Sequence, residues 1–308
     1  MDFLSGLLCL VLSLVLVQAF YSSKGRAKKL PPPPGPPTIP IFGNLFQVGV
    51  NPHRSLAKLA HTHGDIMTLK LGQKTTIVIS SAAMAKEILQ KHDAVFSNRT
   101  IPDAFRALQH HQAGMAWLPV STFTWKHLRK ICNLEIFASK KLDANQHLRQ
   151  RKVEQLVADV HRSCRVGEAV DIGQAAFKTT LNFISNTIFS FDLADSSHTA
   201  QEFREIVQGV TEELGKPNFG DFFLIFKNLD LQGIRRRMTI HFGKLINLFD
   251  RIIDKRLELR KMSNYVSSND LLDTLLDINE HNNEKLDRTL INHLLLVLTF
   301  SPLLNYYF

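Results

Sequence analysis

Two pairs of histidines are the side chains of this 308-residue sequence best suited to bind a metal ion. One pair is His61 and His63, and the other is His110 and His111. A zinc site needs three or four ligands in a fixed geometry, and each ligating ring needs a partner that orients it. Neither pair has further ligands at a suitable spacing. We interpret these residues as solvated loop histidines and predict no metal site.

The carboxylates and nucleophiles of the chain are scattered rather than grouped. Asp192, Asp195, Asp273 and Asp277 are expected at helix ends and on solvated faces. The sequence has no GxSxG nucleophile motif, no glycine-rich phosphate loop, and no HExxH or CxxC metal motif. Its three cysteines are too few for a disulfide framework, which agrees with a cytosolic body. These residues alone predict no catalytic residue.

Composition narrows the class of protein and its partners. With 44% hydrophobic residues and no long polar tract, the body is expected to be globular rather than disordered. The formal net charge of +9 is spread along the chain and favours an anionic membrane surface or an acidic protein partner. No basic run is interleaved with aromatic residues, and no zinc-finger spacing occurs, so no nucleic acid is expected as a partner.

The first 40 residues predict a membrane anchor and a stiff hinge. Residues 3–20 form an apolar run of about 18 residues, which is enough to span the hydrocarbon core of a bilayer. Four basic residues between 24 and 29 mark the cytoplasmic flank, and the prolines of 31–37 form an extended spacer. We predict a transmembrane anchor in membrane lipid over 1–21 and a basic, proline-rich hinge over 22–40.

Two alternatives to the anchor stay open. Val17-Gln18-Ala19 is similar to the cleavage site of a secretory signal, although Asp2 is the first charge where a signal has a basic region. The other alternative is a secreted glycoprotein, in which Asn98 of the sequon Asn98-Arg99-Thr100 would carry a glycan. An uncleaved anchor with a cytosolic body is the better interpretation, because the apolar run is longer than that of a typical signal.

The body is predicted to be mainly α with a small β-sheet near its start. Alternating residues predict a hairpin, with strands over 66–71 and 75–80. Residues 101–119 contain two prolines and no clean period, which predicts a long ordered loop. A helix is expected to begin near Ser121. Helical periodicity predicts further helices over 55–61, 142–165, 175–189, 200–214 and 234–260, with a last one opening at Asp287.

Several segments, taken in order, carry a resemblance to a known family. They are Phe42-Gly43-Asn44-Leu45, Leu142-Asp143-Ala144-Asn145-Gln146, Gly167-Glu168-Ala169-Val170-Asp171-Ile172-Gly173 and Ser185-Asn186-Thr187-Ile188-Phe189-Ser190. In this succession the chain resembles the plant microsomal cytochrome P450 family of haem-thiolate monooxygenases, and in particular its geraniol 8-hydroxylase-like subfamily. The resemblance implies that residues 41–296 form the N-terminal part of the cytochrome P450 fold, behind a single transmembrane helix in the endoplasmic reticulum membrane.

The resemblance also assigns roles on the helix that opens near Ser121. Trp125 and Arg129 match the family's W-x-x-x-R motif, and residues four apart lie on one helical face. They are expected to donate hydrogen bonds to a haem propionate. Lys126, His127 and Lys130 are expected to dock an NADPH-cytochrome reductase. Without the resemblance, a core tryptophan and a solvated basic face would be the simpler interpretation.

Residues 101–119 resemble the family's first substrate-recognition region. Met115, Trp117 and Leu118 are therefore candidate walls of a pocket for a small apolar, terpenoid-like substrate. The implied activity is hydroxylation of that substrate with electrons from NADPH.

Residues 297–308 depart from the family's pattern. The A-G-x-D-T-T oxygen-activating element is absent, and Pro302 is predicted to break the helix there. The F-x-x-G-x-R-x-C-x-G loop, whose cysteine thiolate ligates the iron, is also absent. Cys9, Cys132 and Cys164 do not lie in a comparable loop. We expect a C-terminally truncated form that is inactive as it stands. The alternative is a non-catalytic, membrane-anchored interaction protein that competes for the reductase.

Overall fold

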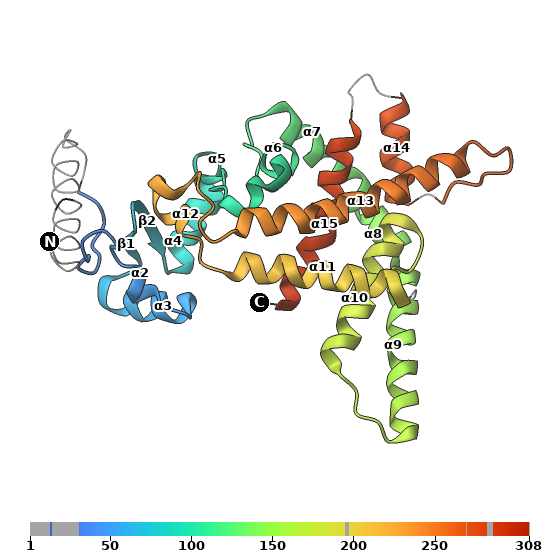
Figure 1. The fold of residues 1–308 in the computed structure, drawn as a ribbon, viewed down its shortest axis with the longest axis horizontal. Coiled ribbons are helices and arrows are strands. Elements are labelled where there is room, and N and C mark those ends of the chain that lie inside the picture. The colour runs from blue at the N-terminus through green and yellow to red at the C-terminus, as the bar shows by residue number, and fades with distance from the viewer. Residues whose placement is uncertain (1–12, 14–30, 195–196, 269, 282–285, 308) are drawn as a thin grey trace, which may run out of the picture. The chain divides into compact units, whose positions relative to one another are not determined.

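The structure is a computed structural model that describes residue 13 and residues 31–194, 197–268, 270–281 and 286–307. The predicted anchor over 1–21, apart from residue 13, lies outside these residues, as does Asp195. Within the described ranges, no helix has both the length and the apolar character needed to cross a bilayer. Helices dominate, and two short strands form a single small sheet (Figure 1), which confirms a mainly α fold with a small β-sheet.

The chain divides into two compact units. The first comprises the described parts of Met1–Ser97 together with Asn218–Leu231, and the second those of Asn98–Pro217 and Gln232–Phe308. The elements of the first unit are α2 (Leu45–Val48), α3 (Pro52–His63), β1 (Ile66–Leu71), β2 (Lys74–Ile79), α4 (Ala82–Lys86), the π-helical turn η1 (Glu87–Lys91), α5 (Asp93–Phe96), α12 (Phe219–Phe222) and the 3₁₀ turn η4 (Leu224–Phe226).

The sheet of the first unit is the predicted hairpin. Strands β1 and β2 pair antiparallel, from Ile66 opposite Ile79 to Leu71 opposite Lys74. Gly72 begins the two-residue turn with φ +60°, and a Cβ there would lie 2.6 Å from the carbonyl oxygen of Phe222. Only glycine fits this combination of positive φ and close backbone approach.

The end of the proline-rich hinge is fastened to this sheet by Asn44. Its side-chain amide donates a hydrogen bond to the carbonyl of Pro37 at 3.0 Å. Its side-chain oxygen accepts one from the backbone N–H of Lys70 at 2.8 Å. Asn44 is buried, so these bonds satisfy polar atoms that would otherwise be costly to bury.

The second unit holds the larger core. Its elements are the 3₁₀ turn η2 (Asp103–Gln109), α6 (His110–Ala113), α7 (Phe123–Ile131), the π-helical turn η3 (Cys132–Ile136), α8 (Ser139–Ala144), α9 (Gln146–Val166), α10 (Ile172–Phe189), α11 (Ser197–Gly215), α13 (Ile234–Arg260), α14 (Leu271–His281) and α15 (Arg288–Tyr307). Helix α13 has the bounds predicted from its periodicity, and it packs against α11, η2 and α15 (Figure 1). Its buried face includes Phe242, Leu245, Phe249 and Ile253.

Helix α15 is buried on all sides over 291–296, in contrast to the one-sided amphipathic helices around it. A helix that is buried all round belongs to the interior of a larger body. The prediction that Pro302 breaks this helix is wrong, because the helical backbone runs through Tyr307. Proline removes one intrahelical hydrogen bond, and the buried turns before it have already set the direction of the helix.

Two other predictions need correction. Residues 101–119 were predicted as a loop with little regular structure, but η2 and α6 occupy much of that segment. Asp273 lies at a helix end as expected, in the first turn of α14, but it is 1% exposed rather than solvated. Tyr265 and Ser267 donate hydrogen bonds to its carboxylate, and Arg256 forms an ion pair with it at 2.9 Å. The chain therefore buries this charge because it supplies donors from α13 and the loop that follows.

Candidate functional site

Helix α7 positions Trp125 and Arg129, the two residues that sequence analysis placed on one face. The helix begins after Thr122, whose side-chain oxygen accepts a hydrogen bond from the backbone N–H of Trp125 at 3.3 Å. Leu128 and Ile131 are buried and anchor the helix in the core. Trp125 is half-buried and Arg129 is exposed. This arrangement keeps both nitrogen-bearing groups at the edge of the core.

The polar groups of these two side chains have no partners among the described residues. Neither the indole N–H of Trp125 nor the guanidinium of Arg129 takes part in a hydrogen bond or ion pair there. The guanidinium offers a planar set of donors that suits an oxygen anion, and the indole adds one further N–H. Together they can hold a carboxylate.

The basic residues on the same helix are arranged unequally. Lys126 and Lys130 are exposed. His127 is half-buried, and its ring stacks on Phe123 with an interplanar angle of 7°. The two lysines therefore present charge to solvent, whereas His127 belongs to an aromatic stack.

The candidate pocket residues of 101–119 lie against the core of the second unit. Met115, Trp117 and Leu118 are each half-buried. Trp117 packs on Phe105 with ring centroids 4.2 Å apart, and the sulfur of Met115 lies 3.7 Å from the thiol of Cys132. The structure thus brings these side chains to one apolar region of the second unit.

His110 is a buried residue whose environment the sequence does not reveal. We interpreted it as a solvated loop histidine, but it is only 3% exposed. Its Nδ1 lies 2.7 Å from the Nδ1 of His293 on α15, which is also 3% exposed. The sequence holds one signal of this burial, because His293 is followed directly by the apolar run Leu294-Leu295-Leu296. A histidine inside such a run needs a polar partner from elsewhere in the chain.

Burial keeps both histidines of this pair uncharged at neutral pH. It lowers the pKa of His110 to about 3, with smaller contributions from His293 and His111. Burial also lowers the pKa of His293, while Asp287 acts weakly in the opposite direction. Desolvation disfavours the charged form of a buried imidazole. In the part of the chain that the structure describes, no group of three or more potential ligands is placed to hold a metal ion.

The described cysteines differ in environment. Cys132 is fully buried, and burial raises the pKa of its thiol to about 11. Cys164 is exposed near the end of α9. A thiolate that ligates a metal needs nearby positive charge or N–H donors to stabilise it. Cys132 remains a neutral thiol, and it contributes to packing rather than to ligation.

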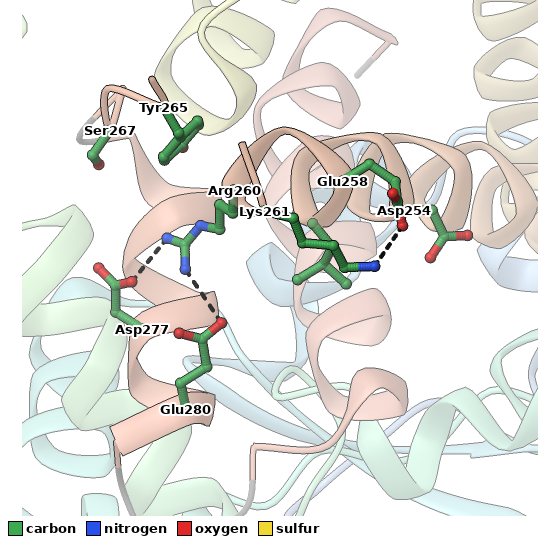
Figure 2. Close-up of a pocket in the computed structure, with 9 residues that line it drawn as sticks. Asp254, Glu258, Arg260, Lys261, Tyr265, Ser267, Asp277 and Glu280 are labelled. Atoms are coloured by element: carbon green, nitrogen blue, oxygen red, sulfur yellow. Dashed lines mark hydrogen bonds and ion pairs between the residues drawn. The ribbon is translucent and has the colours of Figure 1, made fainter. Parts of the chain in front are cut away.

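A surface pocket of about 740 Å³ lies at the C-terminal end of α13, and no residue of α6 or α7 lines it. Figure 2 shows its charged lining, in which Arg260 reaches Asp277 at 2.8 Å and Glu280 at 3.6 Å. Lys261 pairs with Glu258 at 2.8 Å. These charges are engaged with one another, so we assign them to the fixing of α14 and the loop before it.

The sequence is similar to those of known proteins. The family model for cytochrome P450 matches residues 33–301. Geraniol 8-hydroxylase from Catharanthus roseus is 48% identical over 297 residues, which cover 96% of this chain and 59% of that relative. Drimenol monooxygenase from Persicaria hydropiper is 46% identical over 297 residues, covering 96% and 58%. Lauric acid 10-hydroxylase from Petunia hybrida is 46% identical over 290 residues, covering 93% and 50%.

These matches confirm the resemblance that the ordered motifs indicated. The chain spans between 50% and 59% of the length of these three relatives. The family model, in contrast, covers most of the chain. The chain therefore belongs to the cytochrome P450 family.

Proposed function

We propose that the whole protein is a membrane-bound haem-thiolate monooxygenase that hydroxylates small apolar, terpenoid-like substrates with electrons from NADPH through a reductase. Membership of the cytochrome P450 family, which implies haem, supports this proposal. The names of two relatives, geraniol 8-hydroxylase and drimenol monooxygenase, support the substrate class. In this proposal Trp125 and Arg129 bind a haem propionate, and Met115, Trp117 and Leu118 form one wall of the substrate pocket.

The single observation that carries the cofactor assignment is the unpartnered pair of donors on α7. Trp125 and Arg129 would hold a haem propionate, because both present N–H groups that have no partner among the described residues. The bound haem would supply the activation of oxygen. Trp125 and Arg129 of this chain would hold its carboxylate.

The iron ligand does not fit either described cysteine. Cys132 is buried as a neutral thiol, and Cys164 is exposed in the last turn of α9. We therefore propose that the 308-residue polypeptide, expressed by itself, does not hydroxylate. A carbon-monoxide difference spectrum of the haem-loaded, reduced polypeptide tests this proposal, and a band at the thiolate position would contradict it.

A haem titration followed by Soret absorbance tests the α7 pair. Replacement Arg129→Ala removes a charge-assisted hydrogen bond, so haem affinity should fall by about 10-fold or more. Lys130→Ala, one position along the same helix, is the matched control and should bind haem as the parent does. Equal affinity of the Arg129→Ala and Lys130→Ala variants would remove Arg129 from the site.

The location that we propose is the endoplasmic reticulum membrane, with a single-pass anchor over 1–21, the hinge over 22–40 and a cytosolic body. The apolar run over 3–20, its basic flank and the prolines that follow support this topology. We further propose that residues 41–296 act as the N-terminal part of the catalytic domain and that 297–308 form a divergent segment. Enzymatic glycan removal tests the topology, since a glycan on Asn98 would place the body in the lumen.

A second candidate function is a non-catalytic, anchored protein that competes for the reductase. The exposure of Lys126 and Lys130 on α7, where neither has an ion-pair partner among the described residues, favours such docking. The double charge reversal Lys126→Glu and Lys130→Glu should weaken binding of a purified reductase at low salt. The reversal Lys140→Glu on α8, which is also exposed, is the control. Equal binding of both reversed forms would contradict this function.

A further inference from the structure

A groove between α9 and α10 carries more positive than negative charge. The two helices lie side by side (Figure 1), and the groove between them has a volume of about 340 Å³. Its charged lining consists of three cations and one carboxylate, namely Lys152, Arg162, Lys178 and Asp159. This lining has a surplus of two positive charges, which favours a negatively charged ligand.

Lys152 is the most buried of these charges. Its side chain is 6% exposed, and its ammonium group donates a hydrogen bond to Asp192 in the segment after α10. An ammonium group has three N–H donors. Among the described residues Asp192 is the one acceptor that this group contacts, so two of its N–H groups have no acceptor there. A ligand in the groove that carries acceptor oxygens would complete the set, and a buried charge is stable only when such partners are present.

The other two cations lie at the rim of the groove and are held loosely. A carboxylate oxygen of Asp159 lies 3.4 Å from the guanidinium of Arg162 and 3.7 Å from the ammonium of Lys178. Charge-assisted hydrogen bonds are shorter, at about 2.7–2.9 Å. Ser163 adds a hydroxyl group that has no partner within the described ranges. The rim therefore offers donors that a ligand can engage without breaking a strong contact.

We propose that this groove binds a small organic oxyanion, a carboxylate or a phosphate ester with a short apolar body. Lys152 contacts the oxyanion from the inner side of the groove, and Arg162 and Lys178 contact it from the rim. Leu156 and Val160, which also line the groove, pack against the apolar body. No residue of α7 or of 101–119 lines this groove, so the inference does not rest on the proposed function.

The chemistry of the lining selects this class of ligand. Ammonium and guanidinium groups only donate hydrogen bonds, and carboxylate and phosphate oxygens accept them. An amine would be repelled by the surplus charge, and a neutral alcohol would gain no ionic contact. Pockets for small molecules measure about 300–1,000 Å³, and this groove lies at the lower end of that range. A body of about one ring therefore fits it.

Calorimetric titration of the full 308-residue chain in a non-ionic detergent tests the proposal. The probes are benzoate, phenyl phosphate and benzyl alcohol, which share one ring and differ in charge. At least one of the two anions should bind about 10-fold more tightly than benzyl alcohol, because charge-assisted hydrogen bonds distinguish them. The preference should decline as NaCl is added, since salt screens the rim charges. Tighter binding of benzoate assigns the site to carboxylates, and tighter binding of phenyl phosphate assigns it to phosphate esters.

Two variants place the bound anion in the groove. Lys178 is 48% exposed, so Lys178→Ala should fold as the parent does. It should weaken binding of the preferred anion by about 3- to 5-fold, the range of a half-exposed ion pair. Arg165, which is exposed near the end of α9 and does not line the groove, provides the matched control. Arg165→Ala should bind the anion as tightly as the parent, and equal affinities of the two variants overturn the inference.

Lysine side-chain ¹⁵N NMR of the parent chain tests the inner contact without a variant in the site. The preferred anion should shift the Nζ signal of Lys152, and an unmoved signal overturns the inference. Binding of benzyl alcohol as tight as that of both anions also overturns it. Either result leaves the proposed monooxygenase function standing, because no residue of this groove is assigned to the haem or to the substrate.

Discussion

The Nδ1 atoms of His110 and His293 lie 2.7 Å apart, although 183 positions separate the two residues in sequence. This contact joins α6 to the buried helix α15. Because each ring is almost completely buried, the contact is a hydrogen bond between neutral imidazoles rather than a charged pair. The hydrogen bond needs at least one neutral ring, because two protonated rings would place two Nδ1 donors opposite each other.

The free energy of unfolding should fall as the pH decreases below about 6.5. The folded pKa of His110 is lowered to about 3 and that of His293 is lowered too, so the unfolded chain binds protons first. The loss begins at the unfolded pKa near 6.5 and continues toward the folded value, with at most about 1.4 kcal/mol per pH unit for each proton. Urea unfolding between pH 7.5 and 5 measures it. The double variant His110→Phe and His293→Phe should show a flatter dependence, and an equal slope would contradict the assignment.

Replacement Gly114→Ala should destabilise the chain by about 1–3 kcal/mol, because the added methyl group meets the His110 ring at 2.7 Å. Gly243 in the interior of α13 is the matched control, since nothing lies within 4 Å of a Cβ built there. Gly243→Ala should stabilise the chain by about 0.5–1 kcal/mol through helix propensity. Both changes are measured by denaturant unfolding. A neutral Gly114→Ala variant would mean that the His110 ring has another accessible position.

Glu213 links α11 to α13, and its replacement should be costly. Arg237 donates to both carboxylate oxygens, at 2.8 and 2.7 Å, and Lys216 donates at 2.6 Å. Hydrogen bonds from Arg237, opposed by burial, lower the pKa of Glu213 to about 2. The variant Glu213→Gln should lose about 1.5–3 kcal/mol of stability at pH 7, because charge-assisted bonds disappear.

The exposed neighbour Glu212 is the control for that change, and Glu212→Gln should alter stability by less than about 0.5 kcal/mol. The pH dependence gives a second check. The carboxylate's contribution is fully present above its unfolded pKa near 4.5 and is lost as the pH falls toward about 2. Equal losses for Glu213→Gln and Glu212→Gln would show that the link to Arg237 adds nothing.

Removal of the Asp273 carboxylate should cost about 3–5 kcal/mol, because it leaves the buried Arg256 and the half-buried Arg260 with an incomplete set of partners. Burial opposes the charged form of Asp273, but hydrogen bonds from Tyr265 and Arg256 hold its pKa well below the usual range. The variant Asp273→Asn tests this by chemical denaturation. Asp277, which is 57% exposed on the same helix and also pairs with Arg260, provides the control Asp277→Asn. Comparable losses in the two variants would contradict the role of burial.

The sequence by itself determined the features that depend on local periodicity and local turn chemistry. The 3.6-residue repeat of apolar side chains predicted α13 over 234–260, and the alternation around Gly72 predicted the hairpin. The four-residue spacing of Trp125 and Arg129 placed both on one face of α7, and the ordered motifs indicated the family. These features need no knowledge of distant residues.

Only the tertiary structure decided which polar residues are buried and what they contact. His110 reads as a loop histidine and Asp273 as a solvated helix end, yet both are buried against partners from other elements. The burial of His110 depends on α15, which lies far along the chain, and on the absence of a side chain at Gly114. A sequence pattern reports which face of an element is apolar. Whether another element brings a hydrogen-bond partner to a polar residue depends on how the helices pack, and packing joins residues that no local pattern relates.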